Sequence, residues 1–102
     1  MIAIYGQDKL TADARTAALA AAAETLSSRG VSADAAMKAA SVDLLLAEGI
    51  EPGERTDDHY REHGASLTAL DAYHAARAAA EAEIARLDPD NAAFRVMFIA
   101  DA

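Results

Sequence analysis

The sequence predicts a mostly helical α+β domain with the element order β-α-α-α-α-β. Two observations predict this class. More than a quarter of the 102 residues are alanine, the residue with the highest helix propensity, and they fall in three long stretches. The branched and aromatic residues that favour strands gather at the two ends of the chain. We therefore expect a single domain, residues 1–102, with a helical hairpin, two further helices and short N- and C-terminal strands.

The first part of the chain predicts a strand followed by a long helix. Residues 2–5, IAIY, favour a short strand that ends at Gly6. Thr11 is an expected N-cap, and the helix continues up to Gly30. Gly30 followed by Val31 is typical of a left-handed C-terminal glycine with an apolar residue behind it. Because alanine buries little area, we expect a thin core of closely approaching helices.

The second helix is predicted over residues 33–48. Ser32 is its expected N-cap, and Gly49 followed by Ile50 repeats the ending of the first helix. The short connection predicts that the first two helices form an antiparallel hairpin. The segment 51–54, EPGE, then interrupts the helical pattern as a turn.

Two further helices follow this turn. We expect a short helix over 56–63, closed by Gly64, and a longer one from Ser66 to about Leu87, followed by a turn at 88–91. The longer helix carries an apolar stripe at helical spacing, which we expect to face the core. The stripe consists of Leu70, Tyr73, Ala76, Ala80, Ile84 and Leu87.

The segment 94–100, FRVMFIA, is the strongest strand prediction in the chain. Alternation would place Phe94, Val96 and Phe98 on one face and Met97 and Ile99 on the other, so both faces are apolar. We expect helices to cover one face, and a second protomer or a partner to cover the other or extend the edge, which favours a homodimer. A structural subunit that assembles through its terminal strands is an alternative function. Alternatively, the tail only packs against the helices.

The composition excludes several classes of function. The chain has no cysteine, which rules out disulfides, thiolate metal sites and a cysteine nucleophile. We find no signal peptide and no apolar segment long enough for a membrane, so we expect a soluble, cytoplasmic protein. The excess of alanine, and of arginine over lysine, is typical of a bacterial or phage protein. We expect no cofactor.

Charge is distributed unevenly along this acidic chain. The net charge is −8, yet residues 1–30 are neutral, whereas residues 48–71 carry seven acids against two arginines. Without a basic footprint, direct binding to nucleic acid or to an anionic membrane is not expected. A macromolecular partner would instead be basic at the contact.

We therefore expect a non-enzymatic protein-binding module, such as a regulator, inhibitor or immunity-type factor, that docks a basic surface through its acidic middle segment. A nucleic-acid-binding enzyme is one such partner, since carboxylates can imitate phosphates in its groove. The alternative is that the charge serves solubility alone. The acidic segment begins at Glu48, and the residues expected to bind the partner are Glu51, Glu54, Asp57, Asp58 and Glu62.

The segment HYREH contains His59 and His63, which project from one face of a helix at a spacing that suits zinc. With Glu62 as a general base, the pattern resembles the inverzincin motif, which implies a metallohydrolase with a third, downstream glutamate ligand. Glu81 and Glu83 are the candidates for that ligand. The alternative is helix capping, with Thr56, Asp57 and Asp58 at the N-terminus and His63 in the last turn.

The segment YHAARAAA contains His74 followed three residues later by Arg77. This pair resembles the phosphoacceptor helix of histidine phosphotransfer domains, with Ala78 in place of the usual glycine. The resemblance implies that His74 accepts a phosphoryl group and that Arg77 steadies its charge. The alternative is that both residues lie on the surface beside the core stripe.

Overall fold

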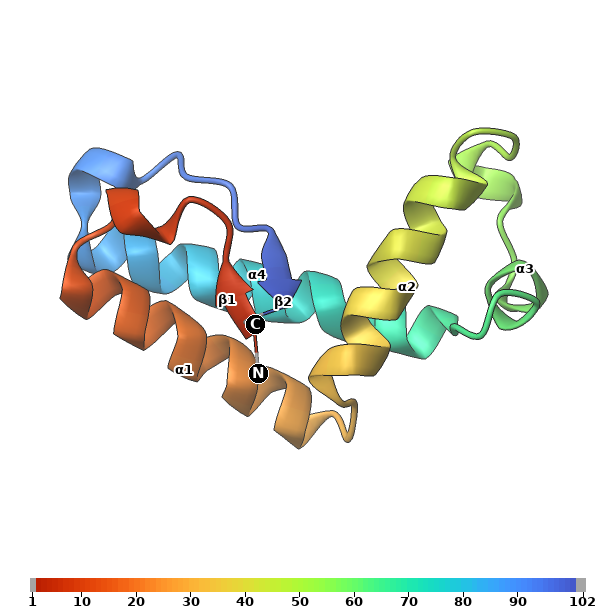
Figure 1. Ribbon diagram of the computed structural model, residues 1–102, viewed down its shortest axis with the longest axis horizontal. Coiled ribbons are helices and arrows are strands. Elements are labelled where there is room, and N and C mark those ends of the chain that lie inside the picture. Colours follow the sequence, from red (N-terminus) through yellow and green to blue (C-terminus); the bar gives the residue numbers. More distant parts are fainter. Residues whose placement is uncertain (1, 101–102) are drawn as a thin grey trace.

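The structure, a computed structural model that describes residues 2–100, confirms the predicted element order (Figure 1). Four helices are flanked by two terminal strands, and short 3-10 turns occupy the connections. The strands are β1 (Ile2–Ile4) and β2 (Phe98–Ala100), and the helices are α1 (Ala12–Ser28), α2 (Ala33–Leu46), α3 (Asp57–Arg61) and α4 (Leu67–Leu87). The 3-10 turns are η1 (Gln7–Lys9), η2 (Pro52–Glu54) and η3 (Pro89–Asn91).

The N-terminal caps of the three long helices are those that the sequence predicts. The hydroxyl of Thr11 accepts a hydrogen bond from a backbone N–H of the first turn of α1 at 3.3 Å. Ser32 and Ser66 do the same for α2 and α4, each at 3.1 Å. Each hydroxyl satisfies one of the N–H groups that have no partner within the helix, which fixes where the helix begins.

The helix endings differ from one another, although the sequence predicts the same ending for α1 and α2. After α1, Gly30 has a φ of 67°, and the N–H of Val31 donates to the carbonyl five residues earlier at 3.0 Å, as predicted. The corresponding prediction at Gly49 is wrong, because its φ is not positive. There the N–H of Ile50 donates to Leu46 at 2.8 Å, so the helical spacing of the bonds continues past the glycine.

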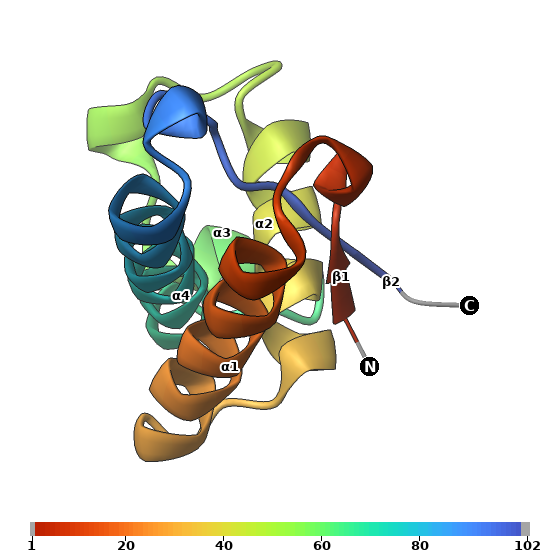
Figure 2. The same ribbon diagram turned by 90° about the vertical axis from the view of Figure 1, so that its left-hand side faces the viewer.

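The α1 and α4 helices form the body of the molecule and lie side by side in opposite directions (Figure 2). Their contact is made of small residues that are completely buried, so the two backbones approach closely, as the alanine content predicts. The fully buried alanines of this core are Ala18, Ala22, Ala72, Ala76 and Ala80. The carboxylate of Asp88, at the end of α4, accepts a hydrogen bond from the N–H of Thr11 at 3.1 Å and ties the two helices together at that end.

The α2 helix follows α1 through a short turn, as expected, but the two helices then diverge (Figure 1). An antiparallel pairing along their length is not observed, because both helices use α4 as their main partner. The outer half of α2 instead packs with α3 and the first turns of α4 around a small second core. This core consists of Ala39, Val42, Leu46, Tyr60, Ala69 and Leu70.

The two terminal strands pair in antiparallel register, with Ala3 opposite Ile99 and Ile4 opposite Phe98. Ile4 and Phe98 are buried against the helices, and the ring of Phe98 meets Tyr73 of α4 edge-on at 5.7 Å between centroids. The predicted alternation is confirmed. The helices cover the inner face of the ribbon, and the apolar outer face is exposed.

The last strand is shorter than the predicted 94–100, because β2 begins at Phe98. The preceding residues 94–97 are not part of a strand, although the carbonyl of Met97 accepts the N–H of Tyr5 at 2.9 Å. Two side chains of α4 take the place of a neighbouring strand at Val96. Glu81 Oε2 accepts the N–H of Val96 at 2.8 Å, and Arg77 Nε donates to its carbonyl at 2.7 Å. A bond of 3.3 Å between Arg77 and Glu81 completes this clasp.

Candidate functional site

The predicted acidic segment forms part of a lobe that projects from the body of the molecule (Figure 1). We call residues 43–63 the acidic lobe. It comprises the end of α2, the connection through η2, and α3, all resting on the second core. Five carboxylates of the lobe are exposed, and in the described part of the chain none of them takes part in an ion pair. They belong to Glu48, Glu51, Glu54, Asp58 and Glu62.

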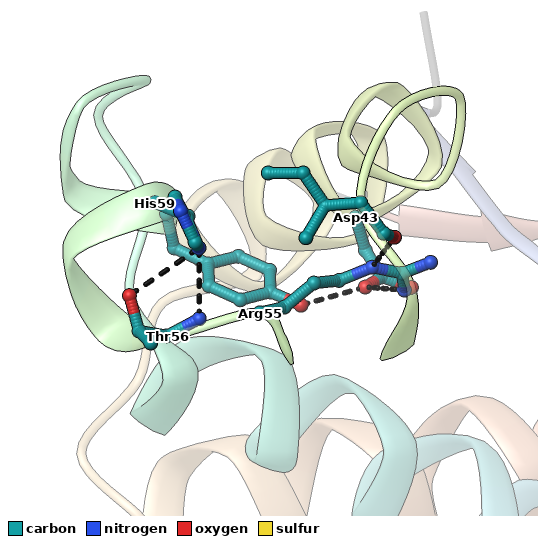
Figure 3. Close-up of polar contacts among 6 residues, drawn as sticks. Asp43, Arg55, Thr56 and His59 are labelled. Carbon is teal, nitrogen blue, oxygen red and sulfur yellow. Dashed lines mark hydrogen bonds and ion pairs between the residues drawn. The ribbon is translucent and has the colours of Figure 1, made fainter. Parts of the chain in front are cut away.

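The guanidinium of Arg55 points inward, although Arg55 is one of only two arginines in the lobe. Its Nη1 donates to Asp43 at 3.0 Å, and its Nε donates to the carbonyl of Ile50, also at 3.0 Å (Figure 3). The same oxygen of Asp43 accepts the hydroxyl of Tyr60 at 2.8 Å. Burial of the Tyr60 ring, and then its hydrogen bond to Asp43, raise the pKa of this phenol. The network fixes α2, the connection and α3 relative to one another.

The second arginine, Arg61, is paired with Asp57 one turn earlier in α3. The other oxygen of Asp57 accepts the N–H of Leu67 at 3.0 Å, at the first turn of α4. This backbone hydrogen bond, and then the Arg61 guanidinium, lower the pKa of the Asp57 carboxyl. Asp57 thus differs from the other predicted partner-binding residues, because both of its oxygens serve the fold.

These internal pairs decide the charge that the acidic lobe presents. Arg55 neutralises a carboxylate of α2 and Arg61 neutralises that of Asp57, so neither offsets the five exposed acids. Lys38 lies beside the lobe, but its side chain runs past Gly64 and forms no ion pair within residues 2–100. Counting charges along the sequence does not show that Asp43 is the residue that binds Arg55 and Tyr60. The available signal is an acid within the apolar run VDLLL.

The structure uses His59 to cap α3. Nδ1 of His59 accepts the backbone N–H of Thr56 at 3.0 Å, the position in which a glutamate or glutamine usually closes a capping box (Figure 3). His63 lies beyond the end of α3 and is exposed. Of the two downstream glutamates, Glu81 holds Val96 and Glu83 pairs with an arginine of its own helix. Within residues 2–100, no three acidic or histidine side chains gather closely enough to hold a metal ion.

His74 is exposed on α4, with its ring edge-on to the neighbouring Tyr73. Arg77, the basic residue that would steady a phosphoryl group, is bound to Glu81 and to the carbonyl of Val96. Its guanidinium therefore already has two partners in the fold. Phosphotransfer through His74 stays a prediction, to be tested by mass spectrometry after incubation with a phosphodonor.

None of the helices in residues 2–100 combines the length and the hydropathy that a membrane crossing requires. Comparison of the chain with protein families, with curated sequences and with solved structures yields no match.

Proposed function

We propose that the protein is a non-enzymatic interaction module that docks a basic surface of another protein through its acidic lobe. The observation that carries the proposal is the use of charge in the lobe. Arg55 and Arg61 are each paired with a carboxylate of the lobe, while five other carboxylates are exposed and have no ion pair within residues 2–100. Such an arrangement concentrates negative potential on a projecting part of the molecule.

The internal bonds of the lobe favour binding in a second way. The contacts among Asp43, Arg55 and Tyr60, together with the second core, hold the carboxylates on a rigid base. A preordered surface loses little conformational freedom when it binds. The spaced carboxylates suit a partner whose own site binds phosphates, so a regulator or inhibitor of a nucleic-acid-binding protein, of bacterial or phage origin, is the role that we propose.

The proposal is tested with a charge-reversed variant in a pull-down from a bacterial lysate. The variant carries Glu51→Lys, Glu54→Lys, Asp58→Lys and Glu62→Lys and leaves Asp57 intact, because Asp57 supports the fold. We expect one protein to bind the native chain in stoichiometric amount and not to bind the variant. Binding should weaken as the salt concentration rises, because the screening length falls from about 10 Å at 0.1 M to about 3 Å at 1 M.

A matched control has the same change in net charge, but its substitutions lie outside the lobe at exposed positions. These are Asp8→Lys, Glu24→Lys, Asp71→Lys and Asp90→Lys. This control should keep the partner. If both variants lose the partner to the same extent, total charge governs binding, and the lobe is not the docking surface. Retention of the partner by the lobe variant would end the proposal directly.

The outer face of the terminal ribbon supports a second candidate, assembly through the strands. Ile99 of β2 is 40% exposed, and Tyr5 and Met97, which flank the ribbon, are 63% and 49% exposed. A second copy covering this face would form a homodimer. Light scattering over a range of concentrations tests this, with Ile99→Lys expected to abolish the dimer. A monomer at every concentration would exclude self-assembly.

A further inference from the structure

A groove of about 400 Å³ lies between α2, α4 and the segment that precedes β2, at the border of the acidic lobe, with which it shares Asp43 and Leu44. This volume falls in the range typical of sites for small ligands. Apolar side chains line much of the groove, and cationic or titratable side chains stand beside them. The residues that define this Leu44–Met97 groove are Leu44, Tyr73, His74, Arg77, Arg95 and Met97.

The charge of the groove is opposite to that of the protein as a whole. Arg95 is exposed and has no ion pair among the described residues, whereas Arg77, which also lines the groove, is paired with Glu81. Among the described residues that line the groove, Asp43 carries the one carboxylate, and its Oδ1 accepts bonds from Arg55 and Tyr60. In a chain of net charge −8, the groove is thus a local site for an anion.

Backbone groups along the groove are already used, which limits what it can bind. Both the N–H and the carbonyl of Val96 are held by Glu81 and Arg77, and the carbonyl of Met97 accepts the N–H of Tyr5 at 2.9 Å. An added peptide strand would find no hydrogen-bonding partners at these positions. At these three backbone groups a ligand finds no free partner, so we base recognition on the side chains.

We propose that the Leu44–Met97 groove binds a small amphipathic anion, an apolar chain or ring that carries one carboxylate. The apolar part packs between Leu44 and Met97, which are 72% and 49% exposed in the free protein and lose water on binding. The carboxylate meets the guanidinium of Arg95, whose planar group can donate two parallel hydrogen bonds. His74 lies at the same site as a further donor.

The first test compares two probes with the same chain, octanoate and octylammonium, by calorimetric titration and by backbone amide shifts at low salt. An acidic protein attracts the cation without any specific site, so a preference for the anion must arise locally. We expect octanoate to bind about tenfold more tightly or better, with shifts centred on Leu44 and Met97. Equal or tighter binding of octylammonium, or no binding of octanoate, overturns the proposal.

Two pairs of variants locate the site. Arg95→Glu should weaken octanoate binding about tenfold, whereas Arg29→Glu, the same change at a remote exposed arginine, should not. Leu44→Glu should abolish binding, whereas Leu45→Glu changes an adjacent residue that is 50% exposed and does not line the groove. All four side chains are largely exposed, so folding is preserved and is checked by circular dichroism. Equal effects within either pair overturn the proposal.

Discussion

Replacement of Glu81 by alanine should lower the free energy of unfolding by more than is usual for a partly exposed side chain. Val96 is only 2% exposed, and its N–H donates to Glu81 at 2.8 Å. Without the carboxylate, this buried N–H has no partner, and a lost bond of this kind costs about 1–3 kcal/mol. Arg77 also loses its ionic partner, so we expect a loss of about 2 kcal/mol of unfolding free energy, or roughly 8–16 °C in melting temperature for a domain of this size.

The assay is thermal and urea unfolding followed by circular dichroism, with hydrogen exchange at the Val96 amide as a local readout. Glu83→Ala is the matched control, because Glu83 lies on the same helix and is also paired with an arginine, but within residues 2–100 its carboxylate accepts hydrogen bonds from Arg86 alone. An exposed pair of this kind contributes about 0–1 kcal/mol. Equal destabilisation by the two variants, or unchanged exchange at Val96, would refute the role of the clasp.

Three further predictions concern the lobe and the core. The raised pKa of Tyr60 means that its contribution to stability is complete below about pH 10 and is lost as the pH rises above that value. Tyr60→Phe should cost about 1 kcal/mol at neutral pH through the lost bond to Asp43 and should remove this alkaline loss in urea titrations. The lowered pKa of Asp57 has the opposite sign, so its contribution is present above about pH 4 and is lost as the pH falls through the lowered value, whereas Asp57→Asn should lack this acid dependence. Ala18→Leu at the fully buried α1–α4 contact should cost about 1–3 kcal/mol or more in thermal unfolding, whereas Ala20→Leu on the exposed side of α1 should be nearly neutral.

Local signals in the sequence were sufficient to predict the beginnings of the helices. Thr11, Ser32 and Ser66 each act within their own helix, so no distant part of the chain can override them. The ending at Gly49 could not be predicted in the same way. The carbonyl of Ile50 accepts Nε of Arg55, and this contact from further along the chain fixes the path after α2.

The clasp at Val96 could not be predicted because its parts are distant in sequence. Glu81 and Arg77 lie off the apolar stripe of α4, and nothing local indicates that their partner is a backbone segment 15 residues beyond Glu81. The candidate site shows the same division. The exposure of the acids can be predicted, because charged residues in a turn usually face solvent. The inward direction of Arg55 cannot, because it depends on Asp43 in α2.

The surface charge of this protein depends on which arginines are paired with carboxylates within the fold. Arg55, Arg61 and Arg77 are each bound to a carboxylate, and two of them also hold backbone carbonyls. In the acidic lobe these pairs take up both arginines, so five exposed carboxylates have no ion-pair partner among the described residues. In the Leu44–Met97 groove Arg95 has no ion pair among the described residues, and the anion site that we propose depends on this guanidinium. Net charge alone would predict that the whole surface repels anions. The pairing of the arginines instead predicts that the acidic lobe binds cationic groups and the Leu44–Met97 groove binds anionic ones.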